Sequence, residues 1–347
     1  GLSISFRLEP LGAVFAMVAS GLWIVNSLYS IGYMRGNAES DQTRFYLCFT
    51  ISIASAMGIA LAGNLITLFF FYEALTLSTF PLVAHKGDAK ARKGAGIYLG
   101  ILMATSIGLL LPAVFAVWHF AGTTDFEAGG ILAGTMGVGA ASVLLVMFAF
   151  GIGKAALMPI HPWLPNAMVA PTPVSALLHA VAVVKAGVFT MLKVSTYTFG
   201  PEFMRSLPAA DVLAWIAAVS IVLASVIAMT KDNLKARLAY STVSQLSYVT
   251  LGAMLATPAA LMGAALQIVM HAYGKITLFM TAGAIYTGSK KSEISQLDGL
   301  GRLMPWTFAA FGLGALSIIG LPPFGGLWPK LFLMEGSAEG GQPWLIA

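Results

Sequence analysis

Long apolar runs alternate with short polar connections along the whole chain. Runs of about 20 apolar residues without strand-like alternation predict membrane-spanning α-helices, because a helix of that length crosses the hydrocarbon core of a bilayer. Ten such segments are predicted, at 11–33, 45–62, 64–84, 95–120, 132–158, 172–193, 209–230, 238–256, 258–287 and 303–334. Since no low-complexity linker separates them, we predict an all-α integral membrane protein with one transmembrane domain over 1–347.

The composition excludes a soluble fold. Hydrophobic residues make up 58% of the 347 residues and charged residues only 10%, with a mean hydropathy of +0.84. A soluble globular protein carries about 25% charged residues, so this chain could not cover a surface in water. The single cysteine, Cys48, excludes a disulfide framework and a thiolate cluster for zinc or iron–sulfur. Because apolar runs lie close to Gly1 and Ala347, we expect a fragment of a longer protein.

Positive charges are distributed unevenly between the connections. If ten segments cross the membrane, twelve Lys and Arg residues fall on one side and three on the other. The rich side comprises the connections at 35–44, 85–93, 231–237 and 288–302, and the poor side holds Arg7, Lys193 and Arg205. The positive-inside rule predicts that the rich side is cytoplasmic and that the protein spans the cell membrane. The same rule accounts for the net charge of +5 without a nucleic-acid partner.

Five ionisable side chains lie within or at the edge of predicted membrane segments: Glu73, Lys154, Lys185, Lys275 and Lys330. Each such charge costs about 2.5–3.5 kcal/mol at the centre of a membrane helix. Five together would cost on the order of 10 kcal/mol, which is comparable to the whole stability of a domain. We therefore predict that these residues carry the function, and this cost argues against a purely structural scaffold.

Two of the segments contain clusters of proline. LMPIHPWLP follows Lys154, and GLPPFGGLWPK ends at Lys330. Proline removes a helical hydrogen bond, so both segments are expected to be discontinuous helices. Paired broken helices in corresponding positions indicate an inverted-repeat transporter, with halves at roughly 45–193 and 209–347. The alternative is a coincidence of two bends rich in Pro and Trp.

Glu73 and Lys154 are the first candidates for proton transfer. A carboxylate near the middle of a membrane segment must be neutral, or be paired with a cation or a water chain. Glu73 is therefore predicted to be a proton site or the partner of a buried lysine; a protonated acid that bonds a neighbouring helix is the alternative. Lys154 lies five residues before Pro159 and would exchange a proton when a nearby carboxylate changes its charge. Snorkelling to the interface is its alternative.

Lysine and histidine recur together in two later segments. His179 and Lys185 lie six positions apart, about 600° of helical turn, and so occupy different faces. His271 and Lys275 lie at i and i+4 and so share one face. We predict that these four residues and Lys330 continue a water-bridged relay. A satisfied interior histidine at 179 and a polar helix contact at 271 and 275 are the alternatives.

The sequence predicts no resident cofactor and no metal. His161, His179 and His271 lie in separate segments, without a spacing that argues for zinc or haem. The stretch GVGAAS that starts at Gly137 follows no strand, and no Walker sequence occurs, so no nucleotide site is expected.

Five blocks of the sequence resemble the antiporter-like membrane subunits of respiratory complex I, membrane-bound hydrogenases and Mrp-type multi-subunit cation/proton antiporters. The blocks are FFFYEAL, KAALMPIHPWLPNAMVAPTPVSALLHAVAVVKAG, NLKARLAYSTVSQLSY, HAYGKITLFMTAGAI, and GLGRLMPWTF followed by GLPPFGGLWPK. They occur in the family's order between Phe69 and Lys330 and so cover nearly the whole chain.

The resemblance implies a fourteen-helix fold with two inverted five-helix repeats, of which this chain would hold helices three to twelve. It places the family's buried glutamate, lysines and histidine on Glu73, Lys154, Lys185, His271, Lys275 and Lys330. It also implies that protons enter at the pair of Glu73 and Lys154 and move laterally past Lys185 towards Lys275 and Lys330.

We therefore predict a proton-translocating subunit with other membrane subunits as its partners and protons, with sodium in an Mrp-type complex, as its cargo. The occurrence of His179 and Lys185 in one segment is more similar to Mrp-type subunits, which favours monovalent cation/proton antiport. A proton-pumping subunit of a complex I or hydrogenase type oxidoreductase is the alternative, so membership of an enzyme stays open. A stand-alone solute transporter is a further alternative, although no arginine in the membrane segments could clamp a carboxylate.

Overall fold

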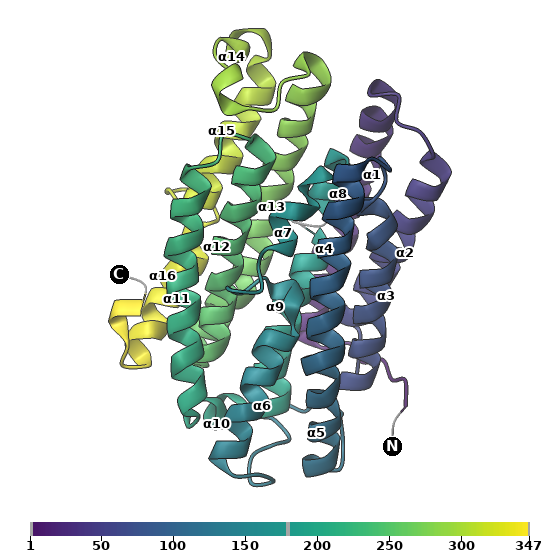
Figure 1. Cartoon of the computed structure of the whole chain (residues 1–347). Helices are drawn as coiled ribbons and strands as arrows, with labels where there is room; N and C mark the ends of the chain where they lie inside the picture. Colours follow the sequence, from purple (N-terminus) through teal and green to yellow (C-terminus); the bar gives the residue numbers. More distant parts are fainter. Residues whose placement is uncertain (1–2, 178–180, 346–347) are drawn as a thin grey trace.

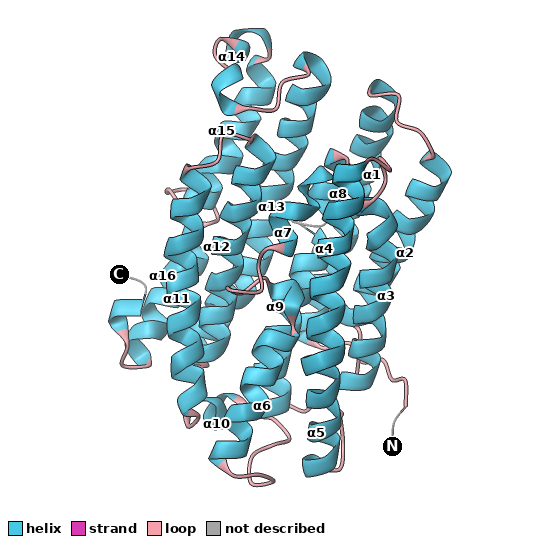
Figure 2. Ribbon diagram, in the orientation of Figure 1, coloured by secondary structure: helices cyan, strands magenta, loops and turns pink. Residues whose placement is uncertain are grey.

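The computed structural model describes residues 3–177 and 181–345, which form helices and no strands (Figure 2). The helices are α1 Pro10–Gly36, α2 Gln42–Ala60, α3 Leu65–Val83, α4 Ala89–Thr105, α5 Leu111–Ala121, α6 Val138–Gly151, α7 Trp163–Asn166, α8 Thr172–Ala176, α9 Val183–Lys193, α10 Pro201–Arg205, α11 Pro208–Met229, α12 Leu234–Leu255, α13 Pro258–Ser289, α14 Leu300–Leu303, α15 Pro305–Ile319 and α16 Leu327–Glu339. The long helices lie along one common axis, with α1 to α5 on one side, α11 to α16 on the other, and α7 to α9 between them (Figure 1).

Six helical stretches of the described chain are long and apolar enough to cross a membrane. They are α1, α2, α3, the continuous stretch Ala89–Ala121 that comprises α4 and α5, α11 and α13. Large apolar side chains such as Val222 and Met229 are exposed on these helices, as expected of a surface that faces lipid. The predicted all-α membrane fold is confirmed, and the protein is a multi-pass membrane protein. The count of ten crossings stays a prediction.

Both predicted breaks are present, but the first begins earlier than the prolines indicated. The predicted segment 132–158 is not one continuous helix, because α6 ends at Gly151 and Lys154 lies in a single turn of 3₁₀-helix, Gly153–Ala155. Ala156 then takes a left-handed conformation, which ends the turn. The indole of Trp163 donates a hydrogen bond of 2.9 Å to the carbonyl of Gly153, so this non-helical backbone keeps a partner in a buried place. The second break separates α15 from α16.

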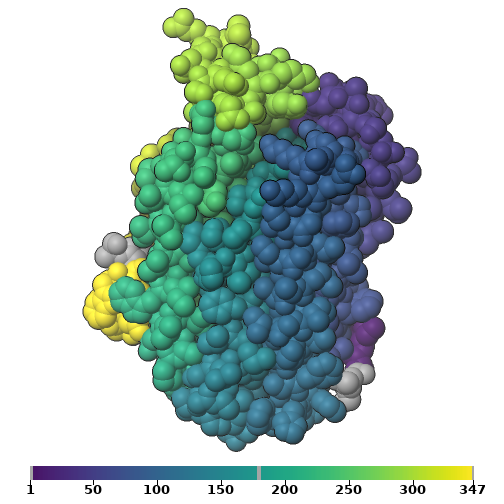
Figure 3. All heavy atoms as spheres, viewed as in Figure 1, coloured from purple at the N-terminus to yellow at the C-terminus, as the bar shows by residue number. Residues whose placement is uncertain are grey.

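The four connections rich in Lys and Arg meet at one end of the bundle. Lys290 donates a hydrogen bond to Asn37, and Arg44 donates one to the carbonyl of His85. Asp232 accepts hydrogen bonds from the side-chain hydroxyl and from the backbone N–H of Ser295. These two bonds hold the pKa of Asp232 below its usual range. The segment around α14 projects beyond the other helices at this end (Figure 3).

Two helices begin at this end with a side-chain cap. Asp88 accepts a hydrogen bond from the backbone of Ala91 at the start of α4, and Asn233 accepts one from Ala236 at the start of α12. Such caps satisfy N–H groups that the helix itself cannot. They fix the first turns of α4 and α12, which carry Lys90 and Lys235.

Candidate functional site

Lys154 is fully buried and its ammonium group lies against α3. Its Nζ donates hydrogen bonds to the carbonyl of Tyr72, at 2.8 Å, and to the hydroxyl of Thr76, at 2.5 Å. The same nitrogen lies 3.2 Å from the centre of the Tyr72 ring, a cation–π contact. The break between α6 and α7 therefore places Lys154 against α3, a helix that is distant in sequence.

Glu73 is the neighbour of Tyr72 in α3 and the acidic charge that acts on Lys154. Both of its carboxyl oxygens are buried and accept no hydrogen bond from the described residues. None of the ion pairs within 4.0 Å among those residues includes Glu73. A buried carboxyl group without a partner is costly when it is ionised. Glu73 thus acts on Lys154 through its charge without an ion pair within 4.0 Å, so that a proton on the carboxyl group changes the field at the lysine.

Gly187 in α9 sets how closely the next helix approaches this break. A methyl group built on Gly187 would overlap the backbone of Lys154 and Ala155, so only glycine allows the contact. Lys185 lies two residues earlier in the same helix. The glycine therefore brings the first and second predicted lysines into adjoining parts of the core.

Lys185 is in direct contact with His271. The Nζ of Lys185 lies 2.7 Å from Nδ1 of His271, and both side chains are buried between α9 and α13. The sequence indicated both residues but not this pair, because helix contacts across a bundle leave no trace in spacing along the chain. At this distance a single proton can be shared by the two nitrogens.

Lys275 follows one turn after His271 in α13, as the i, i+4 spacing predicted. It is fully buried, and its Nζ donates a hydrogen bond of 2.9 Å to the hydroxyl of Ser241 in α12. Lys275 is also the charged group that acts on Lys185. Two lysines that repel one another in a dry interior disfavour simultaneous protonation.

A row of polar side chains on α12 was missed by the sequence analysis. Ser241, Gln245 and Tyr248 lie on one face of α12, and Gln245 accepts a hydrogen bond of 2.8 Å from Gln267 of α13. The ring of Tyr248 lies 5.7 Å from Nζ of Lys330. The sequence could have indicated this row, because the three polar residues recur at spacings of four and three within an apolar segment. This row lines the interval between Lys275 and Lys330.

Lys330 lies in the first turn of α16, just after the second break. Its Nζ donates hydrogen bonds to the carbonyls of Ile318, at 3.0 Å, and Ile319, at 2.7 Å. These carbonyls end α15, where a helix carries a partial negative charge. The lysine is therefore bound to the end of the preceding half of its own broken segment.

Lys193 was wrongly placed among the loop residues. It ends α9, is fully buried, and its Nζ lies 3.1 Å from a carboxyl oxygen of Glu9. The same Nζ donates a hydrogen bond of 2.6 Å to the carbonyl of Ala62 and lies 4.4 Å from the centre of the Phe126 ring. Lys193 is the last residue of the predicted segment 172–193 and follows Lys185 by about two helical turns. This spacing could have indicated that Lys193 lies on the same helix face as Lys185.

The remaining histidines add no metal centre to the described part of the chain. His179 lies outside the described residues. His161 lies 6.0 Å from Tyr240, ring centre to ring centre. No group of three or more metal-binding side chains comes together within 3–177 and 181–345.

Residues 62–347 match the family described as "NADH:quinone oxidoreductase/Mrp antiporter, TM". The chain belongs to this family. The resemblance found in the sequence is thereby confirmed, and this chain is an antiporter-like subunit.

Curated relatives of the chain are named as respiratory subunits. It is 30% identical over 346 residues to "NAD(P)H-quinone oxidoreductase chain 5" of Picosynechococcus sp., covering 95% of this chain and 50% of the relative. It is 30% identical over 347 residues to "NADH-quinone oxidoreductase subunit L" of Mycobacterium tuberculosis, covering 98% of this chain and 53% of the relative. The chain therefore spans about half the length of the curated relatives it matches.

Solved structures of two membrane complexes contain a chain of the same fold. A chain of the Mrp complex from Dietzia sp. matches with a TM-score of 0.86 and 31% identity, over 99% of this chain and 40% of that one. A chain of an archaeal membrane-bound sulfane sulfur reductase matches with a TM-score of 0.89 and 24% identity, over 100% of this chain and 70% of that one. The second likeness concerns the fold alone. Relatives of this chain are thus subunits of multi-subunit membrane complexes.

Proposed function

We propose that this chain translocates protons as one subunit of a larger membrane complex. The proposed path runs laterally through the bundle, from Glu73 and Lys154 past Lys185 and His271 to Lys275, and on to Lys330. The contact of 2.7 Å between Lys185 and His271 is the observation that carries the proposal. Two bases at that distance in a dry interior form a point at which a proton changes residue without leaving the protein.

Attraction and repulsion between the buried charges couple the steps of the proposed path. Lys154 is affected by the charge of Glu73, and Lys185 by that of Lys275. When Glu73 takes up a proton it loses its negative charge, and the protonated form of Lys154 loses its favourable partner. A proton then leaves Lys154, and arrival of that proton near Lys185 disfavours the charge on Lys275 in turn.

The proposed relay is tested by measuring proton flux in membrane vesicles that hold the native complex. Glu73→Gln keeps the shape of the side chain but removes its titration, so we expect proton flux to fall at least about tenfold while the complex still assembles. Arg302→Gln removes one charge from an exposed position at the end of the bundle, and flux should remain at the wild-type value. Wild-type flux in Glu73→Gln would refute the relay, and equal losses in both variants would indicate a defect of assembly.

We further propose monovalent cation/proton antiport of the Mrp type as the source of coupling. The likeness to a chain of the Dietzia Mrp complex, at 31% identity over 99% of this chain, supports it. A proton-pumping subunit of a quinone oxidoreductase is the second candidate, which the names of the curated relatives favour. Iron determination with a visible spectrum on the purified native complex separates the two. Stoichiometric iron–sulfur absorbance would identify a redox-driven complex, and iron-free material would identify an antiporter.

A further inference from the structure

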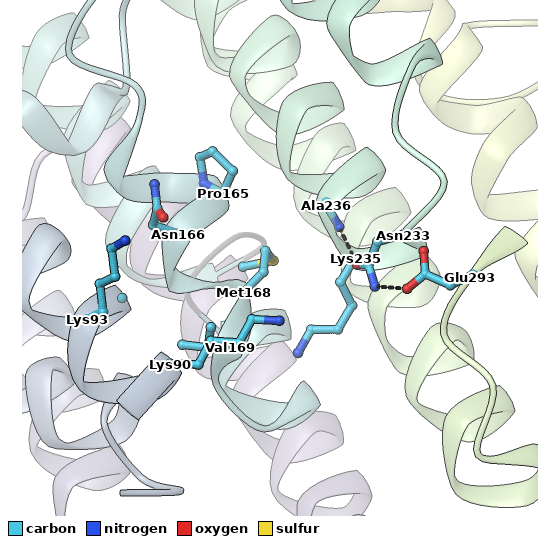
Figure 4. Close-up of a pocket in the computed structure, with 11 residues that line it drawn as sticks. Lys90, Lys93, Pro165, Asn166, Met168, Val169, Asn233, Lys235, Ala236 and Glu293 are labelled. Atoms are coloured by element: carbon cyan, nitrogen blue, oxygen red, sulfur yellow. Dashed lines mark hydrogen bonds between the residues drawn. The ribbon is translucent and has the colours of Figure 1, made fainter. Parts of the chain in front are cut away.

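A cavity of about 530 Å³ opens at the end of the bundle where the charge-rich connections meet. Lys90 and Lys93 of α4 form one wall, and Lys235, at the start of α12, forms the opposite wall (Figure 4). Asn166 and Met168, which follow the first break, lie between them. The volume falls within the range of about 300–1,000 Å³ that is typical of ligand sites.

The lysines of this cavity are not in direct contact with an acidic side chain in the described part of the chain. Among the ion pairs formed there, none includes Lys90, Lys93 or Lys235. Glu293 is the acidic residue of the wall, and its carboxylate accepts hydrogen bonds from Asn233, at 2.9 Å, and from the hydroxyl of Ser292, at 3.2 Å. Three lysines against one acid leave a net positive site.

Lys235 is half-buried, and its ammonium group lines both this cavity and an adjoining one. Its Nζ donates a hydrogen bond of 2.6 Å to the carbonyl of Ala170. An ammonium group carries three N–H donors, and the described residues accept this one, which leaves donors for the cavity. Burial first, and then the like charges of Lys86 and Lys90, lower the pKa of Lys235 to about 7, against the opposing charge of Glu39. Like charges held together here repel one another, and a bound anion would relieve that repulsion.

An adjoining cavity of about 200 Å³ extends the same positive surface. It shares Lys90 and Lys235 with the first and adds Lys86, while its acidic residue, Asp88, is engaged as the cap of α4. Helices α4 and α12 are 17 and 22 residues long, and the first turn of each borders both cavities. The positive ends of the two helix dipoles therefore lie here. Phosphate oxygens are the acceptors that lysines and helix N-termini bind in common.

We propose that the cavity lined by Lys90, Lys93 and Lys235 binds a phosphate group, supplied by the headgroup of an anionic phospholipid. Its position at the ends of membrane helices places it at the depth of lipid headgroups, where basic pockets between helices recruit anionic lipids. Free phosphate offers the same chemistry, and the experiment separates the two sources. The proposal does not depend on proton translocation, because none of the three lysines belongs to the relay.

Lipid binding is measured by native mass spectrometry of the purified complex after titration with phosphatidylglycerol, phosphatidylcholine or inorganic phosphate. We expect phosphatidylglycerol to bind more tightly than phosphatidylcholine. Lys93→Gln should weaken phosphatidylglycerol binding about fivefold, and Lys235→Gln should weaken it by a similar factor. Lys93 is exposed, so its replacement leaves folding intact even if loss of the Lys235 hydrogen bond does not.

Arg92→Gln is the matched control, since Arg92 is the exposed neighbour of Lys93 but does not line the cavity. Equal losses in Arg92→Gln and Lys93→Gln would overturn the site in favour of general surface charge. Inorganic phosphate that binds with the same dependence on Lys93, without preference for phosphatidylglycerol, would keep the phosphate site but assign it to the free ion. Binding of neither phosphatidylglycerol nor inorganic phosphate would overturn the proposal.

Discussion

The two broken segments contain the same elements of sequence but use their lysines differently. At the first break Lys154 is fully buried, and its ammonium group contacts a different helix, at Tyr72 and Thr76. At the second break Lys330 is half-buried and bonds the carbonyls at the end of α15. A lysine bound to the end of its own segment is held by the break itself. A lysine bound to another helix beside the unpartnered carboxyl group of Glu73 can respond to a change of charge there.

The tryptophans of the two breaks differ in the same way. Trp163 is fully buried and donates to the carbonyl of Gly153, whereas Trp328 is 56% exposed. The first break is therefore packed as part of the core, and the second lies at the surface of this chain. Likeness in sequence between the two stretches does not extend to burial. The division into repeat halves at 45–193 and 209–347 stays a prediction.

The largest expected contrast is in proton flux between Lys154→Gln and Lys330→Gln. Loss of Lys154 removes the group next to Glu73, so flux in vesicles should fall at least about tenfold. Loss of Lys330, the half-buried last residue of the proposed path, should lower flux less than loss of Lys154 does. It should also cost about 0.3–1 kcal/mol of stability, because the charge of Lys330 stabilises the end of α15. Proton flux and stability of both variants are measured in the native complex, and assembly of the complex is checked by gel filtration. Complete loss of flux in both variants would show that the two breaks are equivalent in function.

A second contrast concerns how tightly each break is packed. Gly187→Ala would press a methyl group on the backbone of Lys154 and Ala155, so we expect a loss of about 1–3 kcal/mol in the free energy of unfolding. Gly325→Ala is the control at the second break, because its methyl group would meet only the flexible side chain of Met270. That change should stay within about 0.5 kcal/mol. Denaturant titration in detergent measures both, and equal destabilisation would remove the distinction between the breaks.

The all-α membrane fold, the presence of two breaks and the burial of Lys154, Lys185 and Lys275 could be predicted from the sequence, because each rests on a local property. Apolar length, proline and an ionisable residue in a membrane segment are visible one segment at a time. The contact of Lys185 with His271 could not be predicted in this way, since it depends on how α9 and α13 pack. Only tertiary packing placed Glu9 beside Lys193 and brought the start of the chain to the end of α9.

The end of α6, at the first break, shows a further limit of prediction from local sequence. The prolines after Lys154 indicated a break at Pro159, but α6 ends at Gly151. Glycines at 151 and 153 permit close approach to the neighbouring π-helical turn at 106–110 and to Thr105, and the indole of Trp163 satisfies the backbone that follows. A helix can end wherever other groups bind its carbonyls, and those groups are remote in sequence.

The smallest contrast is between Trp163→Phe and Trp328→Phe. Trp163→Phe removes the donor to the buried carbonyl of Gly153, so unfolding should become easier by about 1 kcal/mol, measured by thermal unfolding of the purified complex. Trp328→Phe alters an exposed side chain and should change stability by less than about 0.5 kcal/mol. Equal effects would mean that a partner covers Trp328 in the complex, and that the two tryptophans anchor corresponding breaks after all. The pair of variants therefore tests whether the asymmetry belongs to the protein or only to this chain on its own.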